Sequence, residues 1–300
     1  MSHSALTSRA LPALIAGAVL IGLAPIFVRL AAVGPTSAAF WRLALALPVL
    51  GLLLWRLRPE PQARALASGH LPWLWLAGLC FAADLVLWHQ ALRYTSVANA
   101  TLLSNVAPVF VALAAWLIFR ERSGGRFVIG LLLAMAGAAL LVADSLEIGV
   151  ETVVGDLLGI ASAVFYAGYL LTVSRQRRWF TTVQVMFWST LVGALVTAPL
   201  ALLQGETLLP PDQHAWLMLA GLALLSHVGG QGLIAYALAH LPATFSSVSL
   251  LVQPVAAALF AWVLLGERFG LQQAVGGAIV LGGILLCRLS MQPTAKPGPG

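Results

Sequence analysis

The fold of this 300-residue chain is indicated by residues 108–137, PVFVALAAWLIFRERSGGRFVIGLLLAMAG, which resemble residues 254–283, PVAAALFAWVLLGERFGLQQAVGGAIVLGG. In each stretch an apolar run ends at a short charged break, and a second apolar run follows. This pattern is typical of two membrane-crossing helices that are joined by a tight turn. The identities lie at a shift of 146: Pro108, Trp116, Glu121, Arg122, Gly130 and Gly137 match Pro254, Trp262, Glu267, Arg268, Gly276 and Gly283.

The similarity extends over most of the chain. Further matches precede this segment at shifts of 143, 147 and 145: Leu76–Leu79 with Leu219–Leu222, Phe40-Trp41 with Phe187-Trp188, and Ala16–Val19 with Ala161–Val164. We therefore predict two repeats, residues 1–150 and residues 151–300, each with five helices. Because five is an odd number, the second repeat enters the membrane upside down. Inverted repeats are found in many secondary transporters, whose substrate site lies near the membrane midplane between the halves.

The composition excludes a soluble globular protein. Hydrophobic residues make up 60% of the chain and charged residues 9%, whereas soluble domains carry about 25% charged residues. We therefore expect lipid to cover most of the surface. The net charge of +6 does not indicate a nucleic-acid partner, because the basic residues are scattered between apolar runs and form no basic stripe. The two cysteines, Cys80 and Cys287, lie inside apolar runs and are expected to pack there.

Ten apolar runs predict an all-α membrane protein with ten transmembrane helices, arranged as two inverted five-helix repeats. The predicted helices are approximately Leu11–Val33, Thr36–Trp55, Leu71–Leu92, Ser96–Phe119, Phe127–Ala143, Gly155–Val173, Thr181–Leu203, Ala215–Leu238, Ala243–Leu265 and Leu271–Cys287. The first helix is longer than the hydrophobic region of a signal peptide and belongs to the repeat, so we expect it to be retained.

The arginines and lysines orient the predicted bundle, because these residues are kept on the cytoplasmic side during insertion. With both termini cytoplasmic, 12 of the 16 basic residues lie on that side. They are Arg9, Arg56, Arg58, Arg64, Arg120, Arg122, Arg126, Arg175, Arg177, Arg178, Arg288 and Lys296. The acidic residues that then lie outside are Asp144, Glu147, Glu151, Asp156, Glu206 and Asp212. We expect a multi-pass protein of the bacterial cytoplasmic (inner) membrane.

Residues in both halves carry a resemblance to a known family. The first half contains Phe40-Trp41-Arg42, Asn99-Ala-Thr101, Asn105-Val-Ala-Pro108 and Phe119-Arg-Glu121-Arg122, and the second contains Ser246, Gln253-Pro254 and Leu265-Gly266-Glu267-Arg268. This pattern resembles the EamA family of the drug/metabolite transporter superfamily, and within it is most similar to YddG-type aromatic amino acid exporters. The resemblance implies a ten-helix exporter of small metabolites, with a site between helices 3, 4, 8 and 9 and partly 1 and 6.

Two ionisable residues lie near the middle of predicted helices. Asp84 is in the third helix and His227 in the eighth, at positions that the shift of 143 makes equivalent. Because a charge is costly in lipid, we expect both to face the interior and to pair across the centre. Two interpretations stay open: a structural ion pair, or substrate or proton coupling through a histidine that titrates near physiological pH. His89, nearer the outer end of the third helix, is either a site residue or an interfacial one.

Polar and aromatic side chains at helical spacing indicate a lined cavity. Trp88 and Gln231 follow Asp84 and His227 by four positions, so each shares a helix face with that residue. The fourth and ninth helices carry polar rows that end at prolines, and the sixth carries two tyrosines. The candidate residues for substrate binding or coupling are Asp84, Trp88, His89, Thr101, Ser104, Asn105, Tyr166, Tyr169, His227, Gln231, Ser246, Ser249 and Gln253. Hydrogen bonding between helices without a ligand is the alternative.

Cationic side chains are not expected at mid-depth, because Arg29 and Arg42 lie toward the outer ends of their helices. A cargo with a phosphate group is therefore not favoured. The fifth and tenth helices carry small-residue faces that we expect to pack helix against helix. These faces contain Gly130, Ala134, Ala138, Gly276, Ala278, Gly282 and Gly283.

Together these features predict a secondary transporter that exports small amphipathic metabolites, such as aromatic or other apolar amino acids, by alternating access. The sequence holds no catalytic or metal-binding motif, so we expect no enzyme activity, metal or cofactor. A passive channel or facilitator and an integral-membrane enzyme are the alternatives. The expected partners are a small-molecule substrate and the lipid bilayer, and the oligomeric state is open, with a monomer favoured.

Overall fold

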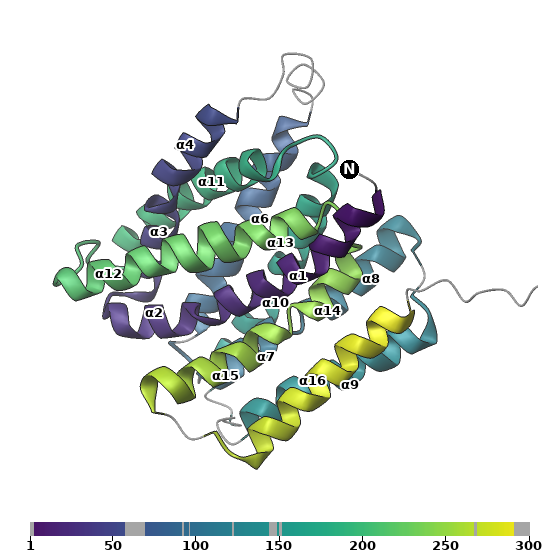
Figure 1. Cartoon of the computed structure of the whole chain (residues 1–300). Helices are drawn as coiled ribbons and strands as arrows, with labels where there is room; N and C mark the ends of the chain where they lie inside the picture. The colour runs from purple at the N-terminus through teal and green to yellow at the C-terminus, as the bar shows by residue number, and fades with distance from the viewer. Residues whose placement is uncertain are drawn as a thin grey trace, which may run out of the picture.

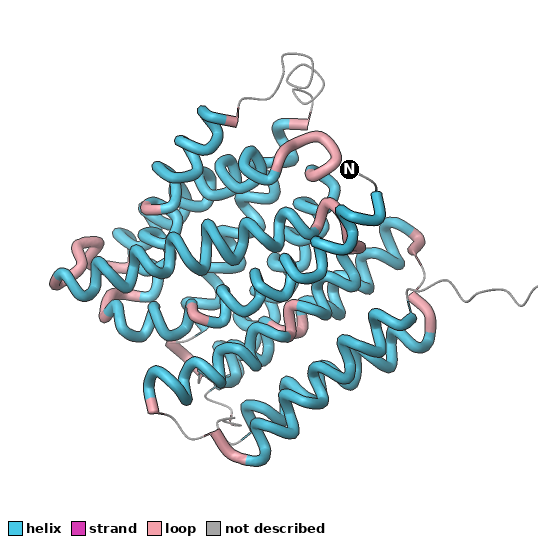
Figure 2. The backbone as a smooth tube through the Cα atoms, in the orientation of Figure 1, coloured by secondary structure: helices cyan, strands magenta, loops and turns pink. Residues whose placement is uncertain are grey.

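The computed structural model describes residues 3–57, 70–91, 93–95, 97–121, 123–143, 149, 152–266 and 269–290. Throughout these residues the chain forms helices, turns and short loops, and the helices pack into one bundle (Figures 1 and 2). Several residues used in the sequence argument lie outside the described part: Arg58, Arg64, Leu92, Ser96, Arg122, Asp144, Glu147, Glu151, Glu267, Arg268 and Lys296.

Ten helical segments of the described chain are long and apolar enough to cross a membrane, which confirms the predicted all-α fold. The ends of these segments agree with the predicted ends to within three residues, although helix α1 itself begins eight residues before the predicted Leu11, at His3. In chain order the spans are α1 (His3–Gly22) with α2 (Ala24–Ala31), α3 (Pro35–Ala44) with α4 (Ala46–Arg56), α6 (Leu71–Ala91), α7 (Val97–Ser104) with α8 (Ala107–Phe119), α9 (Gly125–Val142), α10 (Val153–Gln176), α11 (Thr182–Leu203), α12 (Gln213–Gly221) with η3 (Leu222–Gln231) and α13 (Gly232–Ala237), α14 (Ala243–Ser249) with α15 (Val252–Leu265), and α16 (Leu271–Ser290).

Four of the ten spans are broken where a single continuous helix was expected. A short step separates α1 from α2, α3 from α4, α7 from α8, and α14 from α15. Each break lies within four residues before a proline: Pro25, Pro48, Pro108 or Pro254. Proline has no N–H to donate, and its ring displaces the carbonyl of the preceding turn, so the helix cannot continue regularly. The breaks therefore place irregular backbone inside the bundle, where it can line a cavity.

The eighth span changes from α-helix to π-helix in its middle, over η3. Here Ser226 Oγ donates a hydrogen bond to the carbonyl oxygen of Leu20 on α1, at 3.0 Å. A Cβ atom added to Gly230 would lie 3.1 Å from the carbonyl oxygen of Gly17 on α1. Glycine at position 230 therefore lets η3 approach α1 closely. π-Helical turns inside α-helices frequently mark functional sites.

Large apolar side chains cover the outside of the bundle, as expected for a protein surrounded by lipid. Leu203 and Leu271, for example, are 82% and 81% exposed. The interior also holds many polar residues: among those buried are Thr36, Ser37, Arg42, His89, Ser162, Ser189, Thr190, Thr197, Ser226, His227, Gln231, Ser246, Ser247 and Ser249. A soluble protein shows the opposite preference, so this distribution supports a multi-pass membrane protein.

The helices α9 and α16 pack side by side at the edge of the bundle (Figure 1). A Cβ atom on Gly130 would lie 2.7 Å from the carbonyl oxygen of Gly283, and one on Gly137 would lie 2.7 Å from that of Gly276. The predicted helix-on-helix packing is therefore confirmed for Gly130, Gly276 and Gly283. It was wrong for Ala278 and Gly282, which lie on the exposed side of α16. The two contacts are also reciprocal, because the shift of 146 makes Gly130 equivalent to Gly276 and Gly137 equivalent to Gly283. A two-fold relation between the halves would produce such a pattern.

Gly283→Val is expected to destabilise the folded protein by about 1–3 kcal/mol. A Cβ atom at position 283 would lie 2.5 Å from the backbone nitrogen of Ala134, so α9 and α16 would have to move apart. The measurement is the thermal unfolding midpoint of the purified protein in detergent. Gly282→Val is the matched control, because a Cβ atom at Gly282 meets nothing within 4 Å. Equal midpoints for the two variants would contradict the close packing.

Candidate functional site

A cavity lies in the middle of the bundle, next to the broken spans. Its lining comes from α2, α3, α6, α7, α10, η3 and α15 and from the end of α1. The cavity has a volume of about 130 Å³, whereas one water molecule needs roughly 10–15 Å³ by the same measure. The cavity therefore has room for a solute of about ten heavy atoms.

The cavity occupies only one half of the bundle. We call the half in which α2, α6 and α15 end the distal half, and the half in which α1 begins and α16 ends the proximal half. On α6 the lining runs from Phe81, midway along the helix, to His89, near its distal end. Within the described chain, α4, α8 and α14, which are the proximal parts of their spans, contribute no lining residue. The cavity thus extends from mid-depth into the distal half.

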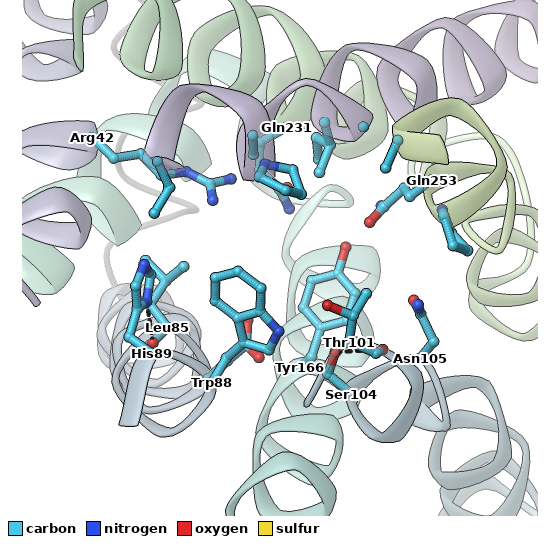
Figure 3. Close-up of a pocket in the computed structure, with 18 of the residues that line it drawn as sticks. Arg42, Leu85, Trp88, His89, Thr101, Ser104, Asn105, Tyr166, Gln231 and Gln253 are labelled. Carbon is cyan, nitrogen blue, oxygen red and sulfur yellow. Dashed lines mark hydrogen bonds between the residues drawn. The ribbon is translucent and has the colours of Figure 1, made fainter. Parts of the chain in front are cut away.

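The lining side chains form two walls that face each other across the cavity (Figure 3). Arg42, Gln231 and Gln253 extend into the cavity from α3, η3 and α15 on one side. The other side carries Leu85, Trp88, His89, Thr101, Ser104, Asn105 and Tyr166, from α6, α7, the turn after α7, and α10. The first wall is therefore rich in nitrogen groups, and the second is rich in aromatic rings and hydroxyls.

Arg42 is the lining residue that the sequence argument missed. It is 8% exposed, and its guanidinium carbon lies 5.8 Å from the centre of the Phe81 ring. Its Nε has no hydrogen-bond partner among the described residues. The expectation of no cationic group at mid-depth was wrong. Arg42 lies seven residues after Pro35 in α3, and this length of helix places it about 10 Å from the distal end of the span. The Phe40-Trp41-Arg42 stretch was the signal that could have found it.

Asp84 lines the cavity but does not pair with His227. Its Oδ1 accepts a hydrogen bond from Ser162 Oγ on α10, at 2.6 Å. His227 is 1% exposed, and its Nε2 lies 2.8 Å from Thr190 Oγ1 on α11. The expected pair across the centre is therefore wrong. The place beside His227 is taken by Phe81, one turn before Asp84 on α6, whose ring centroid is 5.5 Å from that of His227.

Nine of the thirteen candidate residues line the cavity, and four do not. The nine are Asp84, Trp88, His89, Thr101, Ser104, Asn105, Tyr166, Gln231 and Gln253. Tyr169 packs instead on Phe81, with ring centroids 4.8 Å apart, and His227 is hydrogen-bonded to Thr190. Ser246 and Ser249 lie on α14 in the proximal half, where Ser249 Oγ donates to the carbonyl oxygen of Phe245 at 3.0 Å. The polar row expected on the ninth helix is thus split by the break before α15.

Five buried polar atoms of the lining have no hydrogen-bond partner among the described residues: Arg42 Nε, His89 Nε2, Thr101 Oγ1, Gln231 Nε2 and Gln253 Nε2. His89 is 2% exposed, and its Nδ1 lies 2.6 Å from the carbonyl oxygen of Leu85, so it is a buried residue and not an interfacial one. An unpaired buried polar atom costs about 1–3 kcal/mol, and such atoms are rare in protein interiors. Their concentration around one cavity favours a polar ligand there.

Polar contacts join two spans in the proximal half, beyond the cavity. Arg177, directly after α10, donates from Nε to the carbonyl oxygen of Ala235 on α13 at 3.1 Å, and from a terminal nitrogen to that of Phe180. Ser174 Oγ donates to the carbonyl oxygen of Leu238 at 3.4 Å. Burial lowers the pKa of Arg177 from its ordinary value, and the nearby Tyr236 offsets part of this effect. These contacts hold the end of α10 against α13.

At the distal end, the loop between α11 and α12 is hydrogen-bonded to α3 and α6. Glu206 Oε2 accepts from the backbone N–H of Ser37 at 2.8 Å. Gln204 Oε1 accepts from Thr36 Oγ1 at 2.6 Å and from Gln90 Nε2 at 2.8 Å. The loop therefore joins the distal ends of α3, α6 and α11.

The chain is similar to known transporters over most of its length. A model of the EamA-like transporter family matches it twice, at residues 8–143 and at residues 153–289. An Archaeoglobus fulgidus protein described as an uncharacterized transporter is 29% identical over 261 residues, which are 84% of this chain and 87% of that protein. The pseudopaline exporter CntI of Pseudomonas aeruginosa is 27% identical over 232 residues, which are 77% of this chain and 80% of that protein.

A solved crystal structure shares the fold. It matches this chain with a TM-score of 0.78 at 20% sequence identity, and the match covers 94% of this chain and 98% of that one. At this level of identity the likeness concerns the arrangement of the helices alone.

Proposed function

Because the chain belongs to the EamA-like transporter family, we propose that it is a secondary transporter that exports small amphipathic metabolites, in particular aromatic or other apolar amino acids. The observation that carries this proposal is the cavity, which lies beside broken spans and reaches only one half of the bundle. An open pore would reach both halves. A cavity open to one half is what a carrier presents in one of its two states.

The lining supports an amphipathic cargo of amino-acid size. Trp88 and Tyr166 offer aromatic rings, which contribute large apolar contact areas. Ile21, Val28 and Leu222 add aliphatic surface, and the unpaired polar atoms described above supply hydrogen-bonding groups. Export is favoured as the direction of transport because one relative, CntI, is named as an exporter.

We expect the cargo to cross by alternating access between two inverted repeats, residues 1–150 and 151–300. The double match of the family model and the reciprocal glycine contacts of α9 and α16 support this arrangement. If both termini are cytoplasmic in a bacterial inner membrane, the distal half faces outside, so the cavity is that of an outward-facing state. The hydrogen bond from Arg177 to Ala235 then helps to close the cytoplasmic side.

Transport of labelled phenylalanine or leucine by reconstituted vesicles tests the proposal. We expect saturable efflux of the labelled amino acid. Efflux should be faster when unlabelled amino acid is present on the opposite side, because the carrier can then return with an unlabelled molecule bound and exchange it for a labelled one. Vesicles without protein are the control. Flux that rises linearly with concentration would support a passive channel instead, and recovery of a chemically altered cargo would support an enzyme.

A further inference from the structure

The cavity has a surplus of hydrogen-bond donors on one of its two walls. Arg42 Nε, Gln231 Nε2 and Gln253 Nε2 are buried and have no acceptor among the described residues. They lie on the same side of the cavity (Figure 3), and we call these three residues the donor wall. Guanidinium and amide nitrogens only donate hydrogen bonds. The donor wall is therefore matched by a ligand that brings acceptors.

The hydroxyl of Tyr166 points toward the side chain of Gln253 (Figure 3). The amide nitrogens of Gln231 and Gln253 have no hydrogen-bond partner among the described residues, so they are left to donate to a cargo. Gln231 is 1% exposed and Arg42 8%, so these donors are largely withdrawn from solvent.

The cavity also holds a carboxylate. Asp84, on α6, accepts a hydrogen bond from Ser162 Oγ at 2.6 Å. A carboxylate can accept about four hydrogen bonds, so Asp84 keeps acceptor capacity for a cargo. Arg42 and Asp84 both line this cavity. A single small molecule in the cavity can therefore contact both groups.

We infer that the cavity binds its cargo as a zwitterion, with the carboxylate on the donor wall and the ammonium group at Asp84. The inference rests on the proposed function and adds the polarity and orientation of the cargo. The planar fork of Arg42 donates two parallel hydrogen bonds to a carboxylate, and the two glutamine amides donate to its remaining lone pairs. The ammonium group offers three N–H donors, and the carboxylate of Asp84 accepts a hydrogen bond from it. The charges of Arg42, Asp84 and the cargo then sum to zero.

A cargo with only one of the two charges leaves the cavity unbalanced. An amine without a carboxylate leaves Arg42 and both amides unpaired, and a carboxylate without an amine places a like charge near Asp84. A site built to hydrogen-bond a group rejects the analogue that lacks it, because its own buried groups lose their partners. We expect the loss of either charge to weaken binding roughly 10- to 100-fold.

Competition among three molecules that share a phenyl ring tests the inference. Counterflow of labelled phenylalanine into vesicles is measured with unlabelled phenylalanine, phenylethylamine or phenylpropionate as the competitor. Competition is used because the neutral forms of the last two also cross lipid unaided. In the parental protein, phenylalanine is expected to compete at least about tenfold better than either analogue.

Gln253→Glu distinguishes a binding role of the donor wall from a structural one. The substitution replaces a donor by an acceptor of the same shape, so phenylalanine should compete about tenfold less well while phenylethylamine competes better. Arg42→Gln should change the ranking in the same direction. Gln213→Glu, at the exposed start of α12, adds the same charge away from the cavity and should leave the ranking unchanged. For a variant that no longer transports, the ranking is taken from the rise in thermal unfolding midpoint that each competitor causes.

The outcomes separate this inference from the proposed function. Zwitterion binding is overturned if phenylalanine counterflow is saturable but phenylethylamine or phenylpropionate competes as well as phenylalanine. It is also overturned if neither Gln253→Glu nor Arg42→Gln alters the ranking of the competitors. In both cases the transporter proposal stands. Absence of saturable counterflow and of any midpoint shift in the parental protein overturns the amino-acid cargo, and the zwitterion assignment falls with it.

Discussion

Asp84→Asn should lower the rate of saturable transport at least about tenfold without unfolding the protein. Asparagine has the same shape, and its Oδ1 can still accept the hydrogen bond that Ser162 Oγ donates at 2.6 Å. The variant loses the negative charge at the cavity, and a hydrogen bond to a charged group contributes about 1.5–3 kcal/mol. The measurements are the initial rate of phenylalanine counterflow per mole of reconstituted protein and the thermal unfolding midpoint.

Asp212→Asn is the matched control for this loss of charge. Asp212 caps α12 by accepting a hydrogen bond from the backbone N–H of Ala215 at 2.8 Å. Asparagine is an equally good capping residue, and Asp212 does not line the cavity, so this variant should transport at the parental rate. If Asp84→Asn also did so, the carboxylate would have no part in transport, and Arg42 would have to act without a balancing charge.

The ten spans could be predicted because lipid imposes a simple rule on each of them. Every backbone group must be bonded within its own helix, so the length of an apolar run reports the length of a span. The tenth run, predicted from Leu271, begins there in the structure as α16. The contact between α9 and α16 could also be predicted, since a glycine is a place where another backbone can approach. Which side of α16 makes this contact could not, because Gly276 and Gly283 face α9 whereas Gly282 is exposed.

The cavity could be predicted only in part, because it depends on how each helix is broken and rotated. The shift of 143 correctly predicts that Asp84 and His227 lie at similar depth, but it does not predict the direction in which each side chain points. Asp84 is hydrogen-bonded to Ser162, and His227 to Thr190. Gln253 follows the break before Pro254 and lines the cavity, whereas the serines before that break do not. Sequence spacing assumes one continuous helix, so it cannot give this division.

Arg177→Met should shift the protein toward a state whose proximal half is open. The substitution removes the charged donor that binds the carbonyl oxygen of Ala235 at 3.1 Å. Such a hydrogen bond contributes about 1.5–3 kcal/mol, so the ratio of closed to open protein should fall roughly 10- to 100-fold. Ser246→Cys reports the change, because Ser246 is 0% exposed and lies on α14, which packs against α10. With Cys80 and Cys287 replaced by alanine, the rate of its reaction with a maleimide should rise by the same factor.

Arg178→Met controls for the loss of a positive charge at the next position. Arg178 is exposed, and an exposed charge contributes little to holding two elements together, so this variant should leave the maleimide rate unchanged. A rate that Arg177→Met also left unchanged would mean that the buried residues Phe245 and Val248 of α14, 1% and 0% exposed, keep the proximal half closed by packing alone. If the rate rises, the contact between Arg177 and Ala235 sets the balance between the two states. A carrier needs that balance, because closure that is too strong slows the opening step and closure that is too weak connects the two sides of the membrane.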